Sequence, residues 1–183
     1  MSHSAKQFVP LNIAVITVSD TRDASNDTSG DYLRDNAGQA GHNVLTKDII
    51  KDDIYQIRAL ASSHIADPRV QAILITGGTG FTDRDSTPEA MLPLFDKQVE
   101  GFGELFRYLS FKEIGTSTIQ SRAIAGLANG TIIFCLPGST GACRTAWDGI
   151  IRAQLDGAQG PCNFVPHLKN SNAELCKSRQ ITD

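Results

Sequence analysis

Nearly continuous apolar runs place the strongest constraint on how this chain folds. They occupy residues 11–18, 70–75 and 131–136, and residues 44–50 form a similar, less regular run. A strand with one face in water alternates apolar and polar side chains, whereas a strand covered on both faces does not. The runs therefore predict the central strands of a parallel sheet.

Helical patterns separate these strands. The first helix is expected from about Tyr32 to Gly41, and the second begins near Ile54 and ends before Pro68. Strand–helix units in series imply a doubly wound sheet with right-handed crossovers. The expected fold is α/β, a single-domain three-layer sandwich with a mostly parallel, doubly wound sheet.

Length and charge limit the domain count and the partners. A chain of 183 residues with 40% hydrophobic and 20% charged residues suits one soluble globular domain. We expect a tail at residues 1–10, a domain at 11–167, and a polar tail at 168–183, of which residues 171–183 either fray or form a short docking helix. A net charge of -3 and a pI near 5.8 give no electrostatic case for nucleic acid or an anionic membrane. Because residues 1–10 hold no signal-like apolar region and no run is long enough to span a membrane, a cytoplasmic protein is expected.

The cysteines and histidines indicate neither a zinc site nor a disulfide framework. The four histidines are scattered, and no Cys-x-x-Cys pair occurs among Cys135, Cys143, Cys162 and Cys176. Buried thiols are therefore expected.

A glycine-rich loop follows the run at 70–75. It precedes a helix expected to start near Ser86 and consists of Thr76, Gly77, Gly78, Thr79 and Gly80. Glycines let the backbone approach a ligand, so their N–H groups make a donor surface suited to phosphate. Asp83 and Asp85 would repel a polyphosphate unless a cation lay between, and Mg²⁺ is the natural bridge. A tight turn with solvated charges and a capped helix is the plain alternative.

A second strand–loop–helix unit follows the run at 131–136. Its loop contains Pro137, Gly138, Ser139 and Gly141. In an open parallel sheet such loops lie beyond the carboxyl ends of the strands, so both can face one crevice that suits a nucleotide. The alternative is an ordinary turn with Ser139 as a helix cap. Neither loop supplies the lysine of a Walker motif, and a dinucleotide fingerprint fits poorly because Asp83 stands at its third glycine position.

Three further patterns are less specific. Asp52 precedes the second helix, and from the residues alone capping is favoured over catalysis. Residues 116–127 are an amphipathic helix candidate with Arg122 exposed. An apolar stripe that is either core or subunit contact consists of Phe102, Leu105, Phe106 and Leu109.

Four segments together carry a resemblance to a known family. They are Thr76-Gly77-Gly78-Thr79-Gly80, Arg84-Asp85-x-Thr87-Pro88-Glu89-Ala90, Gly101-Phe102 and Leu136-Pro137-Gly138-Ser139. In residue identity, order and spacing they resemble the molybdenum cofactor biosynthesis family of the MoaB/MogA type, whose relatives include the gephyrin G domain. The resemblance spans about Asn12 to His167 and also includes Ser19-Asp20, Asp27-x-Ser29-Gly30, Gly41 and Asp52-Asp53.

The resemblance implies a compact α/β domain, a homotrimer or a homohexamer of two trimers, that binds molybdopterin and Mg²⁺-ATP. Active members transfer AMP to the terminal phosphate of molybdopterin and release pyrophosphate. Carried over by position, Asp52 and Asp85 become the catalytic carboxylates, which overturns the capping interpretation of Asp52. Asp85, with Asp52 or Asp20, would hold Mg²⁺.

The same resemblance divides the other site residues between the two substrates. The nucleotide would contact Thr76, Gly77, Gly78, Thr79, Gly80, Pro137, Gly138 and Ser139. The pterin would contact Asp27, Ser29, Gly30, Ser110 and Arg122, with Ser117 as a further candidate.

Two other functions stay open. A scaffold protein would bind molybdopterin and present it to another enzyme of the pathway without chemistry. A distant branch with a similar loop would instead hydrolyse a nucleotide such as ADP-ribose. The pattern Arg84-Asp85-x-Thr87-Pro88-Glu89 favours adenylylation or pterin binding over hydrolysis.

Overall fold

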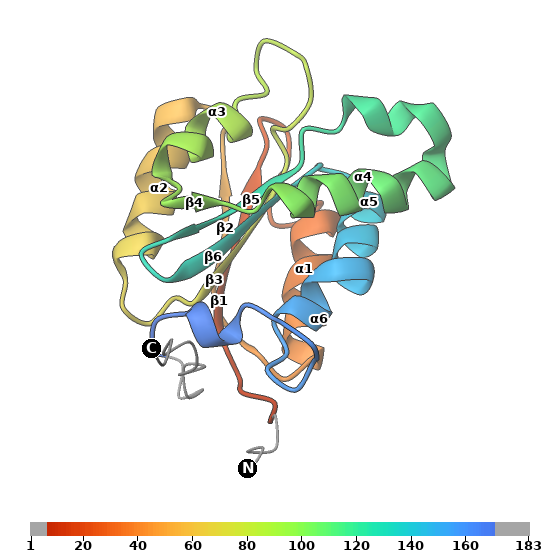
Figure 1. Cartoon of the computed structure of the whole chain (residues 1–183). Helices are drawn as coiled ribbons and strands as arrows, with labels where there is room; N and C mark the ends of the chain where they lie inside the picture. The colour runs from red at the N-terminus through yellow and green to blue at the C-terminus, as the bar shows by residue number, and fades with distance from the viewer. Residues whose placement is uncertain (1–6, 171–183) are drawn as a thin grey trace, which may run out of the picture.

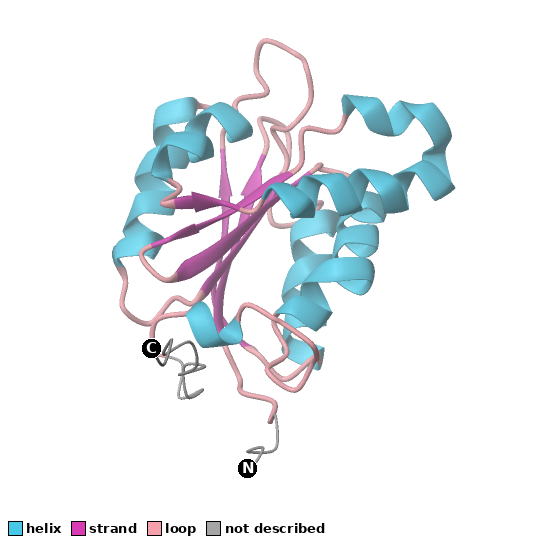
Figure 2. Cartoon of the chain, viewed as in Figure 1, coloured by secondary structure: helices cyan, strands magenta, loops and turns pink. Residues whose placement is uncertain are grey.

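Four parallel strands form the centre of the fold. The computed structural model describes residues 7–170, and its sheet has the strand order β2-β1-β3-β6-β5-β4 (Figures 1 and 2). The parallel strands are β1 (Asn12–Val18), β2 (Asn43–Ile50), β3 (Ala72–Thr76) and β6 (Thr131–Leu136). β5 (Ile124–Ala128) and β4 (Lys97–Gln98) extend the sheet in the antiparallel sense. The expected α/β class with a mostly parallel sheet is confirmed.

Helices cover both faces of this sheet, which makes the expected three layers (Figure 1). One face carries α1 (Thr28–Gln39), α4 (Glu100–Ile114), α5 (Thr140–Ala146), a π-helical turn (Trp147–Ile151) and α6 (Arg152–Gln154). The other face carries α2 (Ile54–Ala66) and α3 (Thr87–Met91). Short 3-10 helices lie at Leu92–Leu94, Gly115–Gln120 and Val165–His167.

Successive residues of each central strand enter opposite cores, as the two-residue period of a strand requires. In β1, Ile13 and Val15 pack with Phe134 in the core that includes α1 and α4 residues. Ala14 and Ile16 pack in the second core, which includes residues of α2. Every residue of β3 and β6 is buried. The apolar runs are therefore continuous because each strand is covered twice.

The cap of α2 corrects one expectation. Asp53, not Asp52, is the N-cap, and its Oδ1 accepts from the backbone N–H of Tyr55 at 3.0 Å and of Gln56 at 2.9 Å. The backbone of Asp53 is extended, with φ −136° and ψ 123°, as an N-cap requires. Asp52 is thereby released from capping and its side chain turns toward another loop.

The segment at 116–127 also differs from expectation, because it is not a helix. It contains the 3-10 helix Gly115–Gln120 and then enters β5, which pairs with β6 through a tight turn. Asn129 and Gly130 make that turn with φ 47° and 67°, the positive angles that Asn-Gly hairpins use. Pairing along β6 outweighs the helical spacing of the segment, and it adds the short edge strand β4 that the sequence did not predict.

The packed structure extends a little beyond the expected boundaries. The Phe8 ring lies 5.2 Å from the His42 ring. Leu168 is buried, and the backbone N–H of Lys169 donates to Gly130 O at 2.8 Å. The choice between a frayed tail and a docking helix concerns residues 171–183, which lie outside the described residues. Across residues 7–170, no helix has the length and apolar character needed to cross a bilayer.

Candidate functional site

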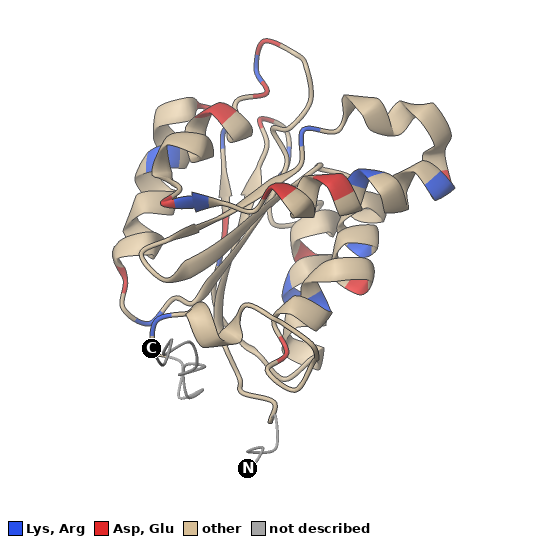
Figure 3. Ribbon diagram, viewed as in Figure 1, with Lys and Arg blue, Asp and Glu red and all other residues tan. Residues whose placement is uncertain are grey.

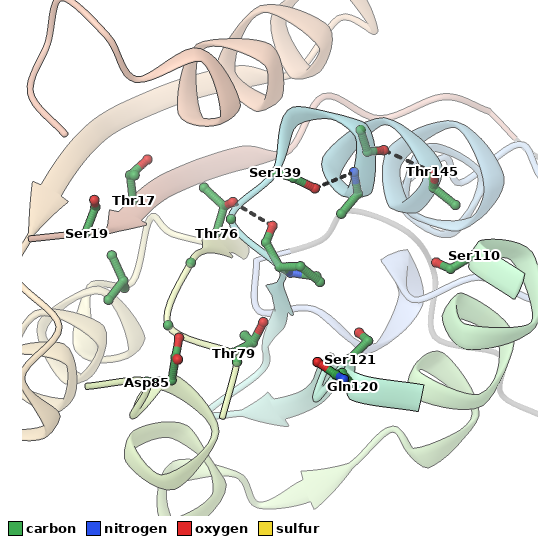
Figure 4. A pocket seen from close by; sticks show the side chains of 18 of the residues that line it. Thr17, Ser19, Thr76, Thr79, Asp85, Ser110, Gln120, Ser121, Ser139 and Thr145 are labelled. Atoms are coloured by element: carbon green, nitrogen blue, oxygen red, sulfur yellow. Dashed lines mark hydrogen bonds between the residues drawn. The ribbon is translucent and has the colours of Figure 1, made fainter. Parts of the chain in front are cut away.

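A cavity of about 800 Å³ opens at the carboxyl ends of β1, β3 and β6 (Figure 4). Both glycine loops, the β1–α1 loop and the polar segment that ends α4 line it. The expected site residues found there are Asp20, Asp52, Thr76, Gly77, Gly78, Thr79, Gly80, Asp85, Ser110, Ser117, Pro137, Gly138 and Ser139. The strand-end rule therefore brings together residues that are far apart in the chain.

The first glycine loop needs its glycines. Gly77 and Gly78 have φ 104° and 63°, which L side chains rarely adopt. A Cβ on Gly77 would collide with Val18 O. The backbone N–H of Gly77 donates to Leu136 O at 3.0 Å, and Thr87 Oγ1 donates to Gly77 O at 2.8 Å. The loop is therefore fixed between β6 and the start of α3.

The second glycine loop lies against the first. Thr76 Oγ1 donates to Pro137 O at 3.1 Å, and a Cβ on Gly138 would lie 3.3 Å from the Cα of Gly77. Ser139 caps α5, since its hydroxyl oxygen accepts from the backbone N–H of Ala142 at 3.2 Å. The two loops face one cavity, as predicted, and Ser139 also has the capping role of the plain alternative.

Each of the two predicted catalytic carboxylates is held by hydroxyl and backbone donors. Asp52 Oδ1 accepts from Ser86 N at 3.1 Å and from Ser86 Oγ at 2.8 Å. Asp85 Oδ2 accepts from Thr82 N at 2.9 Å and from Thr82 Oγ1 at 2.6 Å. Ser86 precedes α3 at its N-cap position without capping it, because its hydroxyl serves Asp52 instead.

The third carboxylate, Asp20, is paired with a cation. Its two oxygens accept from Arg84 Nε at 3.0 Å and Nη2 at 2.9 Å. Arg84 stands between two aspartates at the tip of the loop that leads from β3 to α3, so this tip carries both signs of charge (Figure 3). This ion pair joins the tip to the β1–α1 loop.

The three carboxylates differ in protonation energetics. Burial raises the pKa of Asp52, and the charges of Asp85 and Asp20 raise it further, although hydrogen bonds from Ser86 oppose this. At Asp85 burial also favours the neutral acid, but hydrogen bonds within its own loop outweigh burial and lower the pKa. The hydrogen bond from Arg84 lowers the pKa of Asp20. Negative charge is therefore least compensated at Asp52.

One oxygen of Asp52 faces the first glycine loop. This oxygen, Oδ2, would lie 2.7 Å from a Cβ on Gly78, and it accepts no hydrogen bond from the described residues. Within residues 7–170, no group of three or more His, Cys, Asp or Glu side chains is arranged to hold a metal ion. Mg²⁺ that arrives with a nucleotide needs only one or two protein carboxylates, since phosphates and waters complete its shell. The residues fit such a nucleotide-borne ion.

Three of the residues expected on the pterin side do not line the cavity. Asp27 is fully buried and caps α1, because its Oδ1 accepts from Gly30 N at 3.0 Å. It also accepts from Thr17 Oγ1 at 2.8 Å. A Cβ on Gly30 would collide with Asp27, so this glycine is needed for the cap. Ser29 is buried beside them. Asp27, Ser29 and Gly30 therefore form a layer behind the cavity wall.

Arg122, another expected pterin contact, also lies outside the cavity lining. Its guanidinium donates to Gly80 O at 2.7 Å and to Asp85 O at 3.0 Å, and it forms an ion pair with Glu89. The side chain is 23% exposed. Arg122 thus holds the segment between the first glycine loop and α3, whereas Ser110 and Ser117 do line the cavity.

Several lining residues were not predicted from the sequence. Thr17, Ser19 and Arg22 come from the end of β1 and the loop after it. Their position at the end of the first apolar run and just after it was a usable signal, because ligands bind beyond the carboxyl ends of parallel strands. Thr145 Oγ1 donates to the Glu113 carboxylate at 2.8 Å, a contact between α5 and α4 that the sequence does not indicate.

Comparison with known proteins agrees with this architecture. Residues 14–157 match the family model described as "Probable molybdopterin binding domain". Molybdenum cofactor biosynthesis protein B of Escherichia coli strain K12 is 61% identical over 169 residues, which cover 92% of this chain and 99% of that protein. The protein of the same name from Bacillus subtilis strain 168 is 43% identical over 153 residues, covering 82% of this chain and 90% of that protein.

Solved structures of proteins from the same family are also similar to this chain. A crystal structure of molybdenum cofactor biosynthesis protein B has a TM-score of 0.78 at 40% identity and covers 80% of this chain and 92% of that one. The tungsten cofactor synthesizing protein MoaB from Pyrococcus furiosus has a TM-score of 0.69 at 34% identity, with 79% and 91% covered. The chain belongs to the molybdenum cofactor biosynthesis family of the MoaB/MogA type, with its molybdopterin-binding domain.

Proposed function

We propose that this cavity binds Mg²⁺-ATP and molybdopterin and transfers AMP to the terminal phosphate of the pterin. The observation that carries the proposal is the contact between the two glycine loops, with Asp52 and Asp85 on the same cavity. A cavity of about 800 Å³ also has the size of a typical ligand site. The matched family model, described as a molybdopterin-binding domain, and the relatives named for cofactor synthesis support the pterin as one ligand.

The chemistry needs positioning more than proton transfer. A terminal phosphate oxygen of molybdopterin attacks the α-phosphorus of ATP, the bond to the β-phosphate oxygen breaks, and pyrophosphate leaves. The attacking oxygen is already anionic, so no general base is required. Thr76 and Thr79 hydroxyls and the loop N–H groups are suited to orient phosphates in line. Mg²⁺ held at Asp52 and Asp85 would neutralise charge on the leaving pyrophosphate.

Binding without transfer is the second candidate function, and one observation favours it. Each carboxylate expected to hold the metal already has a partner in the chain: Ser86 for Asp52, Thr82 for Asp85, and Arg84 for Asp20. A protein that only presents molybdopterin has no need to release these contacts. Such a protein would bind the pterin and leave ATP intact.

The deciding experiment incubates purified protein with molybdopterin, ATP and Mg²⁺ and measures pyrophosphate and adenylylated pterin. Transfer predicts both products in equal amounts, and Asp85→Ala should abolish them. Asp83→Ala is the matched control, since Asp83 lies exposed in the same loop and should keep full activity. Pterin binding without either product would establish the second candidate. AMP released from ADP-ribose would instead indicate a hydrolase.

We also propose that the chain forms the trimer or hexamer that the family resemblance implies. Apolar side chains remain exposed along α4 and the turn after it: Leu105 (44%), Tyr108 (59%), Phe111 (55%), Ile114 (55%) and Ile119 (79%). Phe102 and Phe106 of the predicted stripe are buried, so the stripe is core at these positions and exposed at Leu105. Contiguous exposed apolar groups are typical of subunit contacts.

Sedimentation measures the assembly directly. Phe111→Glu should shift the mass from trimer or hexamer toward monomer, because a charge would be buried in the contact. Tyr55→Glu is the control, since Tyr55 is 72% exposed on α2, on the opposite face of the sheet. Monomeric wild-type protein would contradict this proposal.

A further inference from the structure

The cavity is acidic with one basic side chain among its described lining residues. Four carboxylates line it, those of Asp20, Asp52, Asp85 and Glu113, whereas Arg22 is the one Lys or Arg. Phosphate-bearing substrates bring several negative charges into such a space. Coulomb repulsion from the carboxylates makes the placement of Arg22 decisive for where a phosphate can rest.

Arg22 is held in place before any ligand arrives. Its Nη2 donates to Gly138 O in the second glycine loop at 2.8 Å, and its Nη1 donates to Ser29 Oγ. The backbone N–H of Arg22 donates to Ser19 Oγ at 3.2 Å. The side chain is 27% exposed. A guanidinium fixed at both amino groups loses little rotamer freedom when it binds an anion, and its remaining N–H groups are still available as donors.

The charge of Arg22 is not cancelled by the carboxylate behind it. Asp27 lies 3.5 Å from Arg22 Nη1 but 3.0 Å from Lys47 Nζ. Burial favours the neutral acid, yet the Lys47 hydrogen bond and those of Gly30 and Thr17 outweigh it and lower the pKa of Asp27. The buried carboxylate is therefore ionised and lies closer to Lys47 than to Arg22, although Lys47 Nζ also contacts Asp31 Oδ1 at 2.7 Å. The hydrogen bonds of the Arg22 guanidinium go to uncharged acceptors, Gly138 O and Ser29 Oγ, so Arg22 can still offer positive charge on the cavity side.

We propose that Arg22 is a metal-independent phosphate-binding residue, which takes a phosphate group of a substrate beside the second glycine loop. This assigns the layer formed by Asp27, Ser29 and Gly30 to positioning Arg22 rather than to pterin contact. The inference rests on the proposed function, because it assumes phosphate-bearing substrates. A purely structural Arg22 would instead only tie α1 to the second loop.

Calorimetry with inorganic pyrophosphate in EDTA at low salt tests the proposal, because EDTA removes any contribution from a divalent ion. Wild-type protein should bind, and Arg22→Met should weaken binding at least tenfold. Arg22→Lys should give an intermediate affinity, because it keeps the charge but loses the planar fork. Arg34→Met is the matched control: Arg34 lies on α1, is 43% exposed and pairs with Asp31 and Asp35, so its loss should change affinity less than twofold.

Parallel titrations with ATP and with molybdopterin, both in EDTA, identify the substrate that supplies the group. Loss of ATP affinity alone in Arg22→Met assigns Arg22 to the nucleotide, whereas loss of molybdopterin affinity alone assigns it to the terminal phosphate of the pterin. Absence of heat with wild-type protein, or equal affinity in all variants, overturns the proposal. If Arg22→Met does not fold, Arg22→Lys decides, since a structural role predicts unchanged affinity there. Anion binding without AMP transfer would refute the proposed function and leave this inference standing.

Discussion

Replacing Gly78 by alanine tests whether nucleotide binding depends on the backbone shape of the first glycine loop. Gly78 has φ 63°, and a Cβ there would lie 2.7 Å from Asp52 Oδ2 and would also collide with Thr87 Oγ1. An alanine in the left-handed region costs about 1–2 kcal/mol. For a chain of this length 1 kcal/mol corresponds to about 2–4 °C in Tm, so the backbone strain alone should lower Tm by about 2–8 °C.

Gly130→Ala is the matched control for this strain. Gly130 has φ 67°, and a Cβ there would lie 3.0 Å from Lys169 N. It precedes β6, whereas the second glycine loop follows β6, so a strand of about 20 Å separates it from the cavity. Both variants carry the strain of a left-handed alanine, but only Gly78→Ala adds contacts shorter than 3.0 Å, so it should lose more stability than Gly130→Ala and displace Asp52.

Calorimetry with Mg²⁺-ATP measures the consequence. Gly78→Ala should raise Kd at least about tenfold, which is about 1.4 kcal/mol of binding energy. Gly130→Ala should leave Kd within about twofold, because it changes no group near the cavity. Equal affinities in the two variants would show that nucleotide does not rest on this loop, and the geometric reasoning would be refuted.

Three other predictions concern charge, loop support and thiols. Because burial and nearby acids raise the pKa of Asp52, its ionisation destabilises the fold as pH rises through that raised value. Asp52→Asn should therefore raise Tm at pH 7, and this gain in Tm should shrink as the pH is lowered toward the ordinary pKa of 3.8. The same variant should bind Mg²⁺-ATP more weakly. A lower Tm at pH 7 would contradict this prediction. Arg122→Met removes charge-assisted hydrogen bonds to Gly80 O and Asp85 O. The variant should lose about 1–3 kcal/mol of folding stability and should show faster hydrogen exchange at residues 80–85. Unchanged exchange there would refute the role of Arg122 in holding this loop. Burial raises the pKa of Cys143 to about 11, so at pH 8 mass spectrometry should find exposed Cys162 alkylated and Cys143 protected until unfolding.

The sequence predicts the parallel part of the fold because burial there is encoded locally. A strand covered on both faces is apolar along most of its length, and the central residues of β1, β3 and β6 are apolar and buried. The antiparallel part was not predicted, because most residues of β5 belong to a segment whose spacing also fits an amphipathic helix. Its state is decided by pairing with β6, although the Asn129-Gly130 turn between them was a usable hairpin signal.

The site was predictable where one segment carries the chemistry and unpredictable where it depends on contacts between segments. The two glycine loops can be recognised from their composition, and both line the cavity. Asp52 and Asp53 are neighbours of the same type, so the sequence alone cannot tell which caps α2. Arg22 gains its place from Ser29, Asp27 and the second loop, and these contacts exist only after folding.

The three carboxylates most relevant to a divalent ion take their partners from a single segment, residues 82–86. Its donors are Thr82 to Asp85, Arg84 to Asp20, and Ser86 to Asp52. A cation that binds any of these carboxylates therefore competes with a hydrogen-bond donor of that segment. Because the three donors share one short stretch of backbone, the loss of one contact weakens the restraint on the other two. Arg122 holds the segment at Gly80 O and Asp85 O, so the carboxylates can exchange partners while the backbone stays at the rim. Under the proposed function, the affinity of the site for a metal–nucleotide complex would therefore depend on residues 82–86 as well as on the number of acids.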